Sequence, residues 1–380
     1  MKTWKILFTG GGTGGHIFPI IALVREIRRI CPKDRRIEFY YMGPKDEFGE
    51  LLLTQEGVKV KFIMAGKIRR YWNIKSFFQN LIDIFFKFPL GFFQAFFYIF
   101  FLVPDLIFSK GGYGALPVVL AGYFLGSPVF LHESDVSPGI ANKIASKFAQ
   151  EIFVSFSLRD TEYFSPQKVI SVGNPIRREI LEGSIEEGKK IFELSGEKPV
   201  ILVLGGSQGA MRINDLILNI LPEILKDFEL LHQCGEKNFT QVRAESKVVI
   251  DKHLKKYYHL FPFLKEEELK HAYAVADLVI SRAGAGSIFE IAACGKPSIL
   301  IPLPESAQDH QAKNAYTYAR SGACQVIEEV NLTPHFFLGQ IKYLFSSPEK
   351  LKEMGRRAKN WSHPKAGKII AEYIISFLLK

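Results

Sequence analysis

The chain has 380 residues, of which 47% are hydrophobic and 23% charged, so it is long enough to bury two substantial cores, and we expect two α/β domains. Its formal net charge of +10 favours an anionic partner, such as a phosphorylated substrate, an acidic membrane or a nucleic acid. The four cysteines lie far apart without metal-type spacing, and the apolar run after the basic N-terminus is too short for a signal peptide, so we expect reduced thiols in a cytoplasmic protein.

The N-terminal segment has the pattern of a strand, a glycine-rich loop and a helix. The apolar run Lys5–Thr9 predicts a buried strand, Gly10–His16 a loop, and Ile17–Ile30 a helix. Backbone amides at such a helix N-terminus can bind a phosphate. The loop also matches the dinucleotide pattern G-x-G-x-x-G, but a dehydrogenase needs an acidic residue at the end of its second strand. The second predicted strand, Ile37–Met42, ends without one, so a nicotinamide cofactor is not expected.

A basic and aromatic segment follows. Its basic residues, Lys67, Arg69, Arg70 and Lys75, precede a phenylalanine-rich stretch that covers residues 77–103. Polar residues interrupt this stretch, so a full transmembrane span is not expected. Two interpretations remain, namely core helices of the first domain or a surface in the membrane interface whose basic cluster binds anionic headgroups. We expect a mixture in which the core takes most of the phenylalanines.

Two further strands are predicted at Leu106–Ser109 and Pro128–Leu131. The first leads into Lys110–Gly114 and the second into His132–Asp135. The carboxyl ends of strands are where α/β folds place their sites, so both loops are candidates. A lone His-Glu pair such as His132-Glu133 more often has a structural role.

The pattern of strand and glycine loop then begins again. The turn-rich segment Gly173–Arg177 predicts a domain boundary, and Val200–Leu204 runs into the loop Gly205–Ala210. We therefore expect an α/β chain of two doubly wound Rossmann-like domains facing each other across a cleft. Their predicted extents are residues 1–173 and 174–360, with an amphipathic helix in residues 361–380 that packs back on the first domain.

The stretch from Asp277 to Pro302 repeats the pattern once more. An apolar run meets Gly284 and Gly286, and Ser287 is predicted to open a helix that ends near Gly295. Ser287 and Glu290 have the spacing of a capping box, which is one interpretation. In the other, the loop amides bind a diphosphate and Glu290 accepts hydrogen bonds from ribose hydroxyls.

A polar group, Asp309–Asn314, follows the next predicted strand, Ser298–Ile301. Its position suits contact with the hydroxyls of a bound sugar. An N-capping cluster is the alternative.

Taken together, these motifs resemble the bacterial MurG family over nearly the whole chain. This family comprises the UDP-N-acetylglucosamine (UDP-GlcNAc) transferases that glycosylate lipid I, the undecaprenyl-pyrophosphoryl MurNAc-pentapeptide. The motifs that carry the resemblance are GGTGGH at Gly11–His16, GGY at Gly111–Tyr113, His132-Glu133, GNPIR at Gly173–Arg177, GGSQGA at Gly205–Ala210, the loop with Glu290, and HQAKNA at His310–Ala315.

The resemblance implies a GT-B fold with an N-terminal domain for the acceptor lipid and a C-terminal domain for the nucleotide sugar. The implied donor site comprises Thr13, Gly14, Gly15, Asp135, Arg177, Ser207, Leu264, Ala285, Gly286, Ser287, Ile288, Phe289, Glu290 and Gln311. Within it Glu290 would hold the ribose, Ser207 the diphosphate and Gln311 the GlcNAc hydroxyls. The backbone near Leu264 would contact the uracil edge. His16 and Tyr113 would contact the acceptor.

The implied reaction is an inverting transfer without a metal or other cofactor, and the chain contains no Asp-x-Asp metal motif. His16 is the first candidate for the general base, with helix capping as its structural alternative, and Glu133 is the second. Asp135 is a further candidate. It also departs from the family, which has His-Glu-Gln-Asn where this chain has His132-Glu133-Ser134-Asp135, and an aspartate cannot donate the hydrogen bond of an asparagine amide.

The partners implied are UDP-GlcNAc, lipid I and an anionic membrane surface at the cytoplasmic face of the bacterial membrane, without nucleic acid. Within the fold, a transferase that glycosylates a diacylglycerol and a nucleotide-sugar epimerase are the alternatives. A nucleic-acid-binding protein would need basic residues interleaved with aromatics on one face, and no such pattern is found. A non-catalytic membrane adaptor would not need Glu290, Gln311 and three glycine loops.

Overall fold

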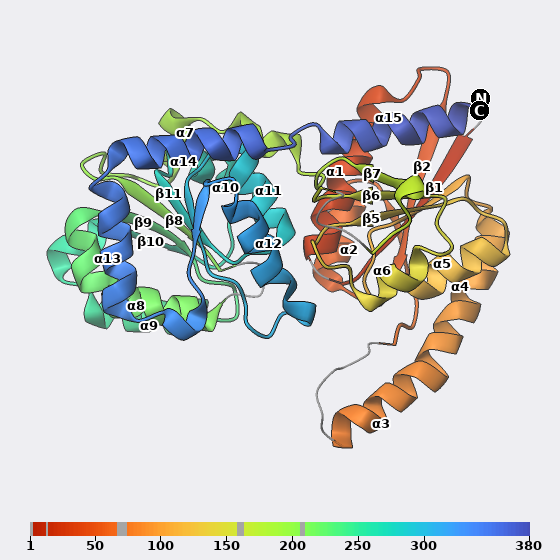
Figure 1. Cartoon of the computed structure of the whole chain (residues 1–380), viewed down its shortest axis with the longest axis horizontal. Coiled ribbons are helices and arrows are strands. Elements are labelled where there is room, and N and C mark those ends of the chain that lie inside the picture. Colours follow the sequence, from red (N-terminus) through yellow and green to blue (C-terminus); the bar gives the residue numbers. More distant parts are fainter. Residues whose placement is uncertain (1–2, 13, 67–73, 158–162, 206–209) are drawn as a thin grey trace. The chain divides into compact units, whose positions relative to one another are not determined.

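A computed structural model describes residues 3–12, 14–66, 74–157, 163–205 and 210–380, and of residues 74–77 it describes the backbone alone. The chain divides into two compact units. Unit 1 consists of Met1–Arg177 and Pro364–Lys380, and unit 2 of Arg178–His363. Each unit contains one parallel sheet with helices around it (Figure 1). The prediction of two doubly wound Rossmann-like α/β domains is therefore confirmed.

The sheet of unit 1 has seven strands in the order β3-β2-β1-β4-β5-β6-β7. Its strands are β1 (Thr3–Thr9), β2 (Arg36–Gly43), β3 (Lys59–Phe62), β4 (Leu106–Ser109), β5 (Val129–Glu133), β6 (Glu151–Val154) and β7 (Val169–Ser171). The strand order reverses between β1 and β4, which is where doubly wound folds bind ligands. The loops that follow Thr9 and Ser109 therefore lie at the expected site.

The helices of unit 1 are α1 (Gly14–Ile30), α2 (Glu47–Gln55), α3 (Ile74–Ile82), α4 (Phe88–Leu102), α5 (Leu116–Phe124), α6 (Ile140–Ala145) and α15 (Ala366–Leu379). The C-terminal helix α15 packs on α1, and Ile370 and Ile374 share a buried cluster with Ile20 and Ile27. Apolar residues at helical spacing on both helices produce this contact.

One continuous helix of unit 1 runs from α3 through a π-helical segment, Asp83–Lys87, into α4 (Figure 1). Its part Phe78–Leu102 is long and apolar enough to cross a membrane, although length and composition alone also fit a core helix. Asp83 is buried in the π-helical segment, and its carboxylate lies 2.6 Å from the Lys87 ammonium.

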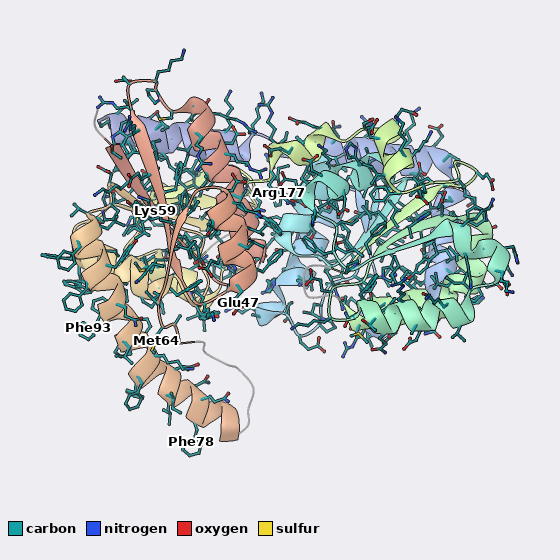
Figure 2. The ribbon with its side chains drawn as sticks, turned by 180° about the vertical axis from the view of Figure 1, so that it is seen from behind. Glu47, Lys59, Met64, Phe78, Phe93 and Arg177 are labelled. Carbon is teal, nitrogen blue, oxygen red and sulfur yellow. The ribbon has the colours of Figure 1, made fainter. Side chains whose placement is uncertain are left out.

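Most of the phenylalanines of this helix are exposed, although Phe92 and Phe96 are partly buried against the core of unit 1. Those that are exposed are Phe78, Phe85, Phe86, Phe93, Phe97, Phe100 and Phe101. In Figure 2 the labelled side chains of Phe78 and Phe93 point outward. The expectation that the core takes most of these phenylalanines is wrong. The buried face of α4 instead carries small or aliphatic residues (Gly91, Ala95, Ile99 and Leu102). At Gly91 the helix backbone lies so close to the carbonyl group of Met64 that a side chain would collide with it.

The sheet of unit 2 has six strands in the order β10-β9-β8-β11-β12-β13. Its strands are β8 (Val200–Leu204), β9 (Glu229–Gln233), β10 (Tyr258–Phe261), β11 (Leu278–Ser281), β12 (Ser298–Leu300) and β13 (Cys324–Val326). Its helices are α7 (Ile185–Ile191), α8 (Met211–Asp227), α9 (Phe239–Val249), α10 (Glu266–Val275), α11 (Ala285–Ala293), α12 (His310–Ala319), α13 (Pro334–Phe345) and α14 (Pro348–Trp361). The order reverses between β8 and β11, so the loops after Leu204 and Ser281 meet at the switch point.

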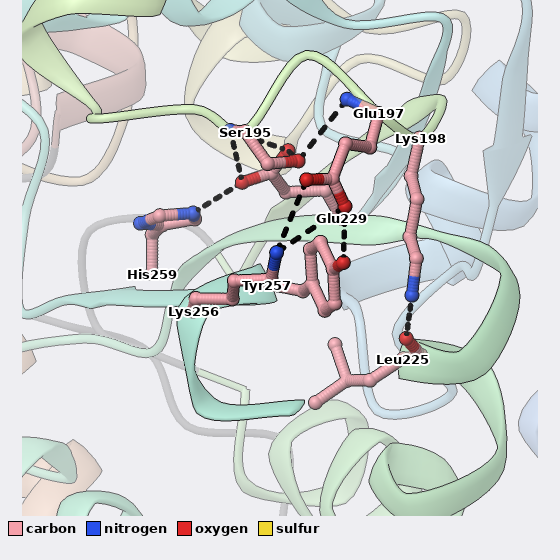
Figure 3. A network of polar contacts seen from close by, with 8 residues as sticks. All are labelled: Ser195, Glu197, Lys198, Leu225, Glu229, Lys256, Tyr257 and His259. Carbon is pink, nitrogen blue, oxygen red and sulfur yellow. Dashed lines mark hydrogen bonds and ion pairs between the residues drawn. The ribbon is translucent and has the colours of Figure 1, made fainter. Parts of the chain in front are cut away.

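A buried carboxylate fixes the opposite edge of this sheet, where the strands begin. Glu229, the first residue of β9, is fully buried. It accepts hydrogen bonds of 3.1 Å from the backbone amide of Ser195, 2.9 Å from the Ser195 hydroxyl and 2.8 Å from His259 Nε2 (Figure 3). A buried carboxylate with these donors stabilises the fold rather than acting on a ligand, since parallel sheets bind ligands at their carboxyl edge.

Candidate active site

The glycine loop of unit 1 connects β1 to α1 and places His16 in the first turn of the helix. A Cβ added at Gly11 would lie 2.9 Å from His16 Cε1, and one added at Gly112 would lie 3.0 Å from His16 Nε2. The imidazole therefore lies against two glycines, one from each loop at the strand-order reversal. Gly14 is buried and Gly15 is exposed, whereas Thr13 lies outside the described residues.

The loop after β4 approaches the helix that follows β5. Gly111 and Gly112 have φ angles of 83° and 86°, which glycine adopts without strain. A side chain at Gly111 would collide with the amide group of Asn142 in α6. Tyr113 follows in the turn before α5 and is partly exposed, as contact with an acceptor requires. These glycines therefore allow the loops after β4 and β5 to pack closely.

Glu133 is the last residue of β5, so the strand extends two residues beyond the predicted end. Only 4% of its surface is exposed. Its Oε2 accepts a 2.6 Å hydrogen bond from Asn142 Nδ2, and its Oε1 accepts a 2.9 Å bond from the backbone amide of Asp135. Burial and the neighbouring charge of Asp135 raise the pKa of Glu133. Glu133 thus has internal partners on both oxygens, whereas Asp135 is partly exposed.

His132 is fully buried beside Glu133. Its Nε2 lies 3.2 Å from the carbonyl oxygen of Gly173. Burial, and then the positive charge of Lys110, holds the pKa of His132 well below its usual range. His132 therefore remains neutral and links β5 to the segment before Arg177, which is the structural role left open by the sequence.

Arg177 is the last residue of unit 1 before unit 2 begins, and it is labelled in Figure 2. Its side chain is 5% exposed, and its guanidinium carbon lies 4.2 Å from the centroid of the Phe18 ring in α1. This cation–π contact holds the guanidinium against the helix that begins at the glycine loop.

In unit 2 the loop after β11 leads into α11, which starts at Ala285 with Gly284 as its N-cap. The prediction that Ser287 opens the helix is wrong, because Gly284 is already the extended residue before it (φ −66°, ψ 141°). Gly284 has no side chain that could cap this N-terminus. A Cβ added at Gly284 or Gly286 would meet no described atom within 4 Å. The first amides of α11 are therefore open to an anionic ligand.

The residues predicted from Ala285 to Glu290 divide into two groups. Ala285, Ile288 and Phe289 have buried side chains, so only their backbone atoms can take part in binding. Gly286, Ser287 and Glu290 are partly exposed. Because Ser287 and Glu290 are three residues apart on a helix, they lie on one face. The position predicted for ribose binding thus neighbours the open end of the helix.

Gln311 lies in the first turn of α12, and its orientation is fixed by the loop before it. Its Oε1 accepts a 3.0 Å hydrogen bond from the backbone amide of Leu303. The side-chain NH₂ group is then the part of Gln311 that can donate to a ligand. The backbone amide of Leu264 donates a 3.0 Å bond to Gln233 Oε1, so the predicted contact with uracil would fall to the Leu264 carbonyl oxygen. Ser207 lies outside the described residues.

An ion-pair network beside α11 was not predicted from the sequence. Arg282 donates a 3.2 Å hydrogen bond to the Ile301 carbonyl oxygen and pairs with Glu329. Arg212 also pairs with Glu329, and with Glu305 at 3.1 Å. These contacts hold the loops after β11 and β12 in place. Within the described ranges, no group of His, Cys, Asp and Glu side chains is arranged to hold a metal ion.

Comparison with known families gives two matches in chain order. The glycosyltransferase family 28 N-terminal domain matches residues 6–154, and the family's C-terminal domain matches residues 200–370.

Curated relatives match over almost the full length. The UDP-N-acetylglucosamine--N-acetylmuramyl-(pentapeptide) pyrophosphoryl-undecaprenol N-acetylglucosamine transferase of Clostridium tetani is 38% identical over 347 residues, which is 91% of each chain. A Bacillus cereus transferase of the same name, numbered 2, is 37% identical over 349 residues, 92% of this chain and 93% of that protein.

Solved structures agree with these matches. The crystal structure of Acinetobacter baumannii MurG has a TM-score of 0.72 at 25% identity and covers 98% of this chain and 99% of that chain. The UDP-GlcNAc 2-epimerase of Neisseria meningitidis has a TM-score of 0.66 at 15% identity over 98% and 100% of the chains, which shows a shared fold alone. The predicted GT-B fold is confirmed.

Proposed function

This chain belongs to the MurG family within glycosyltransferase family 28, and on that premise we propose that it transfers GlcNAc from UDP-GlcNAc to lipid I. The acceptor atom is the 4-hydroxyl oxygen of MurNAc, and the product is lipid II for peptidoglycan synthesis. The observation that carries the proposal is the 38% identity to the Clostridium tetani transferase over 91% of both chains.

Unit 2 would bind the donor. As the bond from the anomeric carbon to UDP breaks, negative charge builds on the diphosphate, and the amides at the open end of α11 stabilise it. Glu290 holds the ribose hydroxyls, and Gln311 donates from its NH₂ group to the GlcNAc hydroxyls. Ser207 and Arg177 are assigned to the diphosphate by resemblance. Removing one such donor from an active site typically lowers turnover by about 10²- to 10³-fold.

Unit 1 would bind the acceptor and supply the base. In a single displacement, the 4-hydroxyl oxygen bonds to the anomeric carbon, its proton passes to a base, and UDP leaves with the electron pair, which inverts the anomeric configuration. His16 is our first candidate, because its partly exposed ring lies where the two unit 1 loops meet. Glu133 is less suited, since both of its oxygens accept internal hydrogen bonds.

Unit 1 would also attach to the membrane that holds the acceptor lipid. The exposed phenylalanines of the helix from α3 through the π-helical segment to α4 form an apolar surface, and such surfaces mark sites of membrane or protein contact. Because Ala95 and Ile99 on the other face pack into the core of unit 1, α4 has protein on one side, which favours lying in the interface over spanning the bilayer. The basic residues assigned to headgroup binding lie outside the described side chains, so their role stays a prediction: Lys67, Arg69, Arg70 and Lys75.

A panel assay tests this function. The purified protein is mixed with UDP-GlcNAc, UDP-GalNAc, UDP-glucose or UDP-galactose, and with either a short-chain lipid I analogue or a diacylglycerol. Mass spectrometry then reads the products. We expect one N-acetylhexosamine on the lipid I analogue, with UDP-GlcNAc preferred over the other donors. Glycosylated diacylglycerol would support the alternative transferase, and loss of UDP-GlcNAc to an epimer without acceptor would support an epimerase.

A further inference from the structure

We propose that Trp361 is a positioning residue for the donor, because it fixes the spacing between α11 and α12 and thereby allows the nucleotide and the sugar of UDP-GlcNAc to be held together. The assignment rests on the proposed function, in which Glu290 of α11 holds the ribose and Gln311 of α12 the GlcNAc hydroxyls. Trp361 would act on the donor through these two helices.

Trp361 is the last residue of α14, and its ring contacts one ring from each donor helix. The centroids of Trp361 and Phe289, which belongs to α11, are 4.8 Å apart with an interplanar angle of 46°. The centroids of Trp361 and Tyr318, which belongs to α12, are 4.7 Å apart at 63°, an edge-to-face arrangement. Phe289 is 1% exposed and Tyr318 is fully buried. One side chain thus touches both helices from inside unit 2.

The C-terminal half of α14 is attached to the end of α11, and the two helices pack on each other (Figure 1). Lys359 Nζ donates a 2.6 Å hydrogen bond to the carbonyl oxygen of Ala293, the last residue of α11. A Cβ added at Gly355 would lie 2.8 Å from the carbonyl oxygen of Gly295, so a larger residue there would push the helices apart. Because α14 is fixed on α11, the ring of Trp361 acts as a spacer toward α12.

The residues that Trp361 contacts lie on the same helices as the predicted donor contacts and close to them. Phe289 directly precedes Glu290 in α11. Tyr318 follows Gln311 by seven residues in α12, which is about two helical turns on one side of the helix. A change at Trp361 would therefore shift Gln311 relative to Glu290.

A hydrogen bond also joins the two helices nearer to the donor. Asn314 Nδ2, in the second turn of α12, donates to the carbonyl oxygen of Ala283, which precedes α11. At 3.4 Å this bond is long, so it tolerates small shifts. The packed rings of Phe289, Trp361 and Tyr318 tolerate less, since a protein core leaves few voids. The spacing therefore depends mainly on the rings.

This geometry separates two quantities that a general loss of stability would change together. The nucleotide is assigned to α11, which α14 holds through Lys359, so UDP can still bind when α12 moves. The additional affinity for the sugar depends on Gln311 in α12. A wrong spacing should therefore weaken the binding of UDP-GlcNAc more than that of UDP, whereas partial unfolding would weaken both.

The binding test compares W361L, W361F and Y318L with the wild-type protein by calorimetry, after urea denaturation has shown which variants fold. We expect the Kd for UDP-GlcNAc to rise about tenfold in W361L, while the Kd for UDP stays within about twofold. W361F should retain most of the affinity, because it keeps a ring at the contact. Y318L breaks the contact from α12 and should show the same difference, so it carries the test if W361L does not fold. The proposal is overturned if either leucine variant binds UDP-GlcNAc as the wild type does, or loses as much affinity for UDP.

A double-mutant cycle tests whether Trp361 acts through Gln311. Q311E has no NH₂ group for the sugar, so adding W361L should weaken UDP-GlcNAc binding by less than about twofold beyond Q311E alone. Additive losses would refute action through Gln311.

The matched control is F345L in α13. The rings of Phe345 and Phe228 have centroids 4.6 Å apart at 48°, which is close to the geometry of Trp361 and Phe289. Removing this ring should lower stability, as removal of a packed side chain does, without changing the ratio of the two affinities. A change in that ratio as large as the one in W361L would mean that any loss of packing in unit 2 has this effect.

Hydrogen exchange of the ligand-free protein tests the spacing without any substrate. W361L should speed the exchange of backbone amides in α12, whereas F345L should speed it in α13 instead. Unchanged exchange in α12 of W361L would refute the spacer role. Should the wild-type protein bind neither UDP nor UDP-GlcNAc, the proposed function is wrong, yet the exchange measurement still reports on Trp361.

Discussion

The backbone amide of Leu303 donates a 3.0 Å hydrogen bond to Oε1 of Gln311, across the turn that connects β12 to α12. Two residues in this turn, Gln308 and Asp309, have φ angles of 59° and 54°, which non-glycine residues seldom adopt. The turn is thus strained. The hydrogen bond from Leu303 across it fixes both the position of Gln311 and the direction of its NH₂ group.

We therefore predict that Gln311→Glu separates folding from donor binding. A glutamate retains an oxygen for the Leu303 amide but has no NH₂ group for a sugar hydroxyl, and it adds negative charge to a site for an anion. The KM for UDP-GlcNAc should rise about tenfold, which corresponds to about 1.4 kcal/mol, while the free energy of unfolding changes by less than about 0.5 kcal/mol. Gln241→Glu, an exposed substitution of the same kind in α9, is the control. An unchanged KM in the Gln311 variant would remove Gln311 from the donor site.

We predict that His16→Ala lowers kcat by about 10²- to 10⁴-fold, the usual contribution of a general base. The affinity for UDP should stay within about twofold, because His16 is not assigned to the nucleotide. Calorimetry with UDP and initial rates with the lipid I analogue measure the two quantities. The control is His335→Ala, which removes an exposed histidine from α13. Turnover near the wild-type value would leave His16 with the structural role of contacting Gly11 and Gly112.

A third prediction concerns the acid sensitivity of unit 2. His232 is fully buried, with Nε2 3.0 Å from Asn214 Oδ1 and Nδ1 2.8 Å from the Tyr258 hydroxyl. Asn214 donates through Nδ2 to the Cys234 carbonyl oxygen, so its Oδ1 is the acceptor and His232 carries its proton on Nε2. Burial lowers the pKa of His232 to about 3 from an ordinary 6.5.

Because the folded-state pKa is depressed, the contribution of neutral His232 to stability is complete above pH 6.5 and is lost as pH falls toward 3. The loss approaches about 1.4 kcal/mol per pH unit. The difference in unfolding free energy between wild type and His232→Gln should therefore shrink between pH 7 and pH 5, as measured by urea denaturation. A difference that stays constant over this range would contradict the prediction, because it would mean that His232 takes up its proton as readily in the folded protein as in the unfolded one.

We also predict that membrane binding depends on the exposed face of α4. The variant F93S/F97S/F101S changes side chains that are 56%, 60% and 79% exposed. Since burying one phenylalanine contributes about 1.5–3 kcal/mol, cosedimentation with phosphatidylglycerol vesicles should weaken at least tenfold. Phe336→Ser in α13 of unit 2, which is 43% exposed, should have no effect. Binding of the triple variant at the wild-type level would place the membrane contact elsewhere.

The strands and loops that carry the site could be predicted from short-range patterns in the sequence. Each relevant strand is a run of apolar residues followed by a glycine loop, and the predicted bounds of Leu106–Ser109 and Val200–Leu204 match β4 and β8. A spacing of three residues, however, cannot tell an N-cap from the third residue of a helix. Ser287 was misplaced for this reason, since its neighbours Ala285 and Gly286 are already helical.

Such patterns could not predict contacts between residues that lie far apart in the sequence. Ser134 lies 24 positions beyond Lys110, and the two meet because β4 and β5 are paired in parallel. Likewise, the composition of residues 77–103 shows many phenylalanines but not which helix face they occupy. That face depends on where α4 meets the backbone at Met64, through Gly91.

The structure of the glycosylated product is the most direct measure of the proposed function. The protein is incubated with UDP-GlcNAc and the short-chain lipid I analogue in the presence of EDTA, and the product is characterised by NMR. Because a single displacement inverts the anomeric carbon, we predict one β-linked GlcNAc on the 4-hydroxyl oxygen of MurNAc. An α linkage, attachment at another hydroxyl group, or no product until a divalent metal is restored would contradict it.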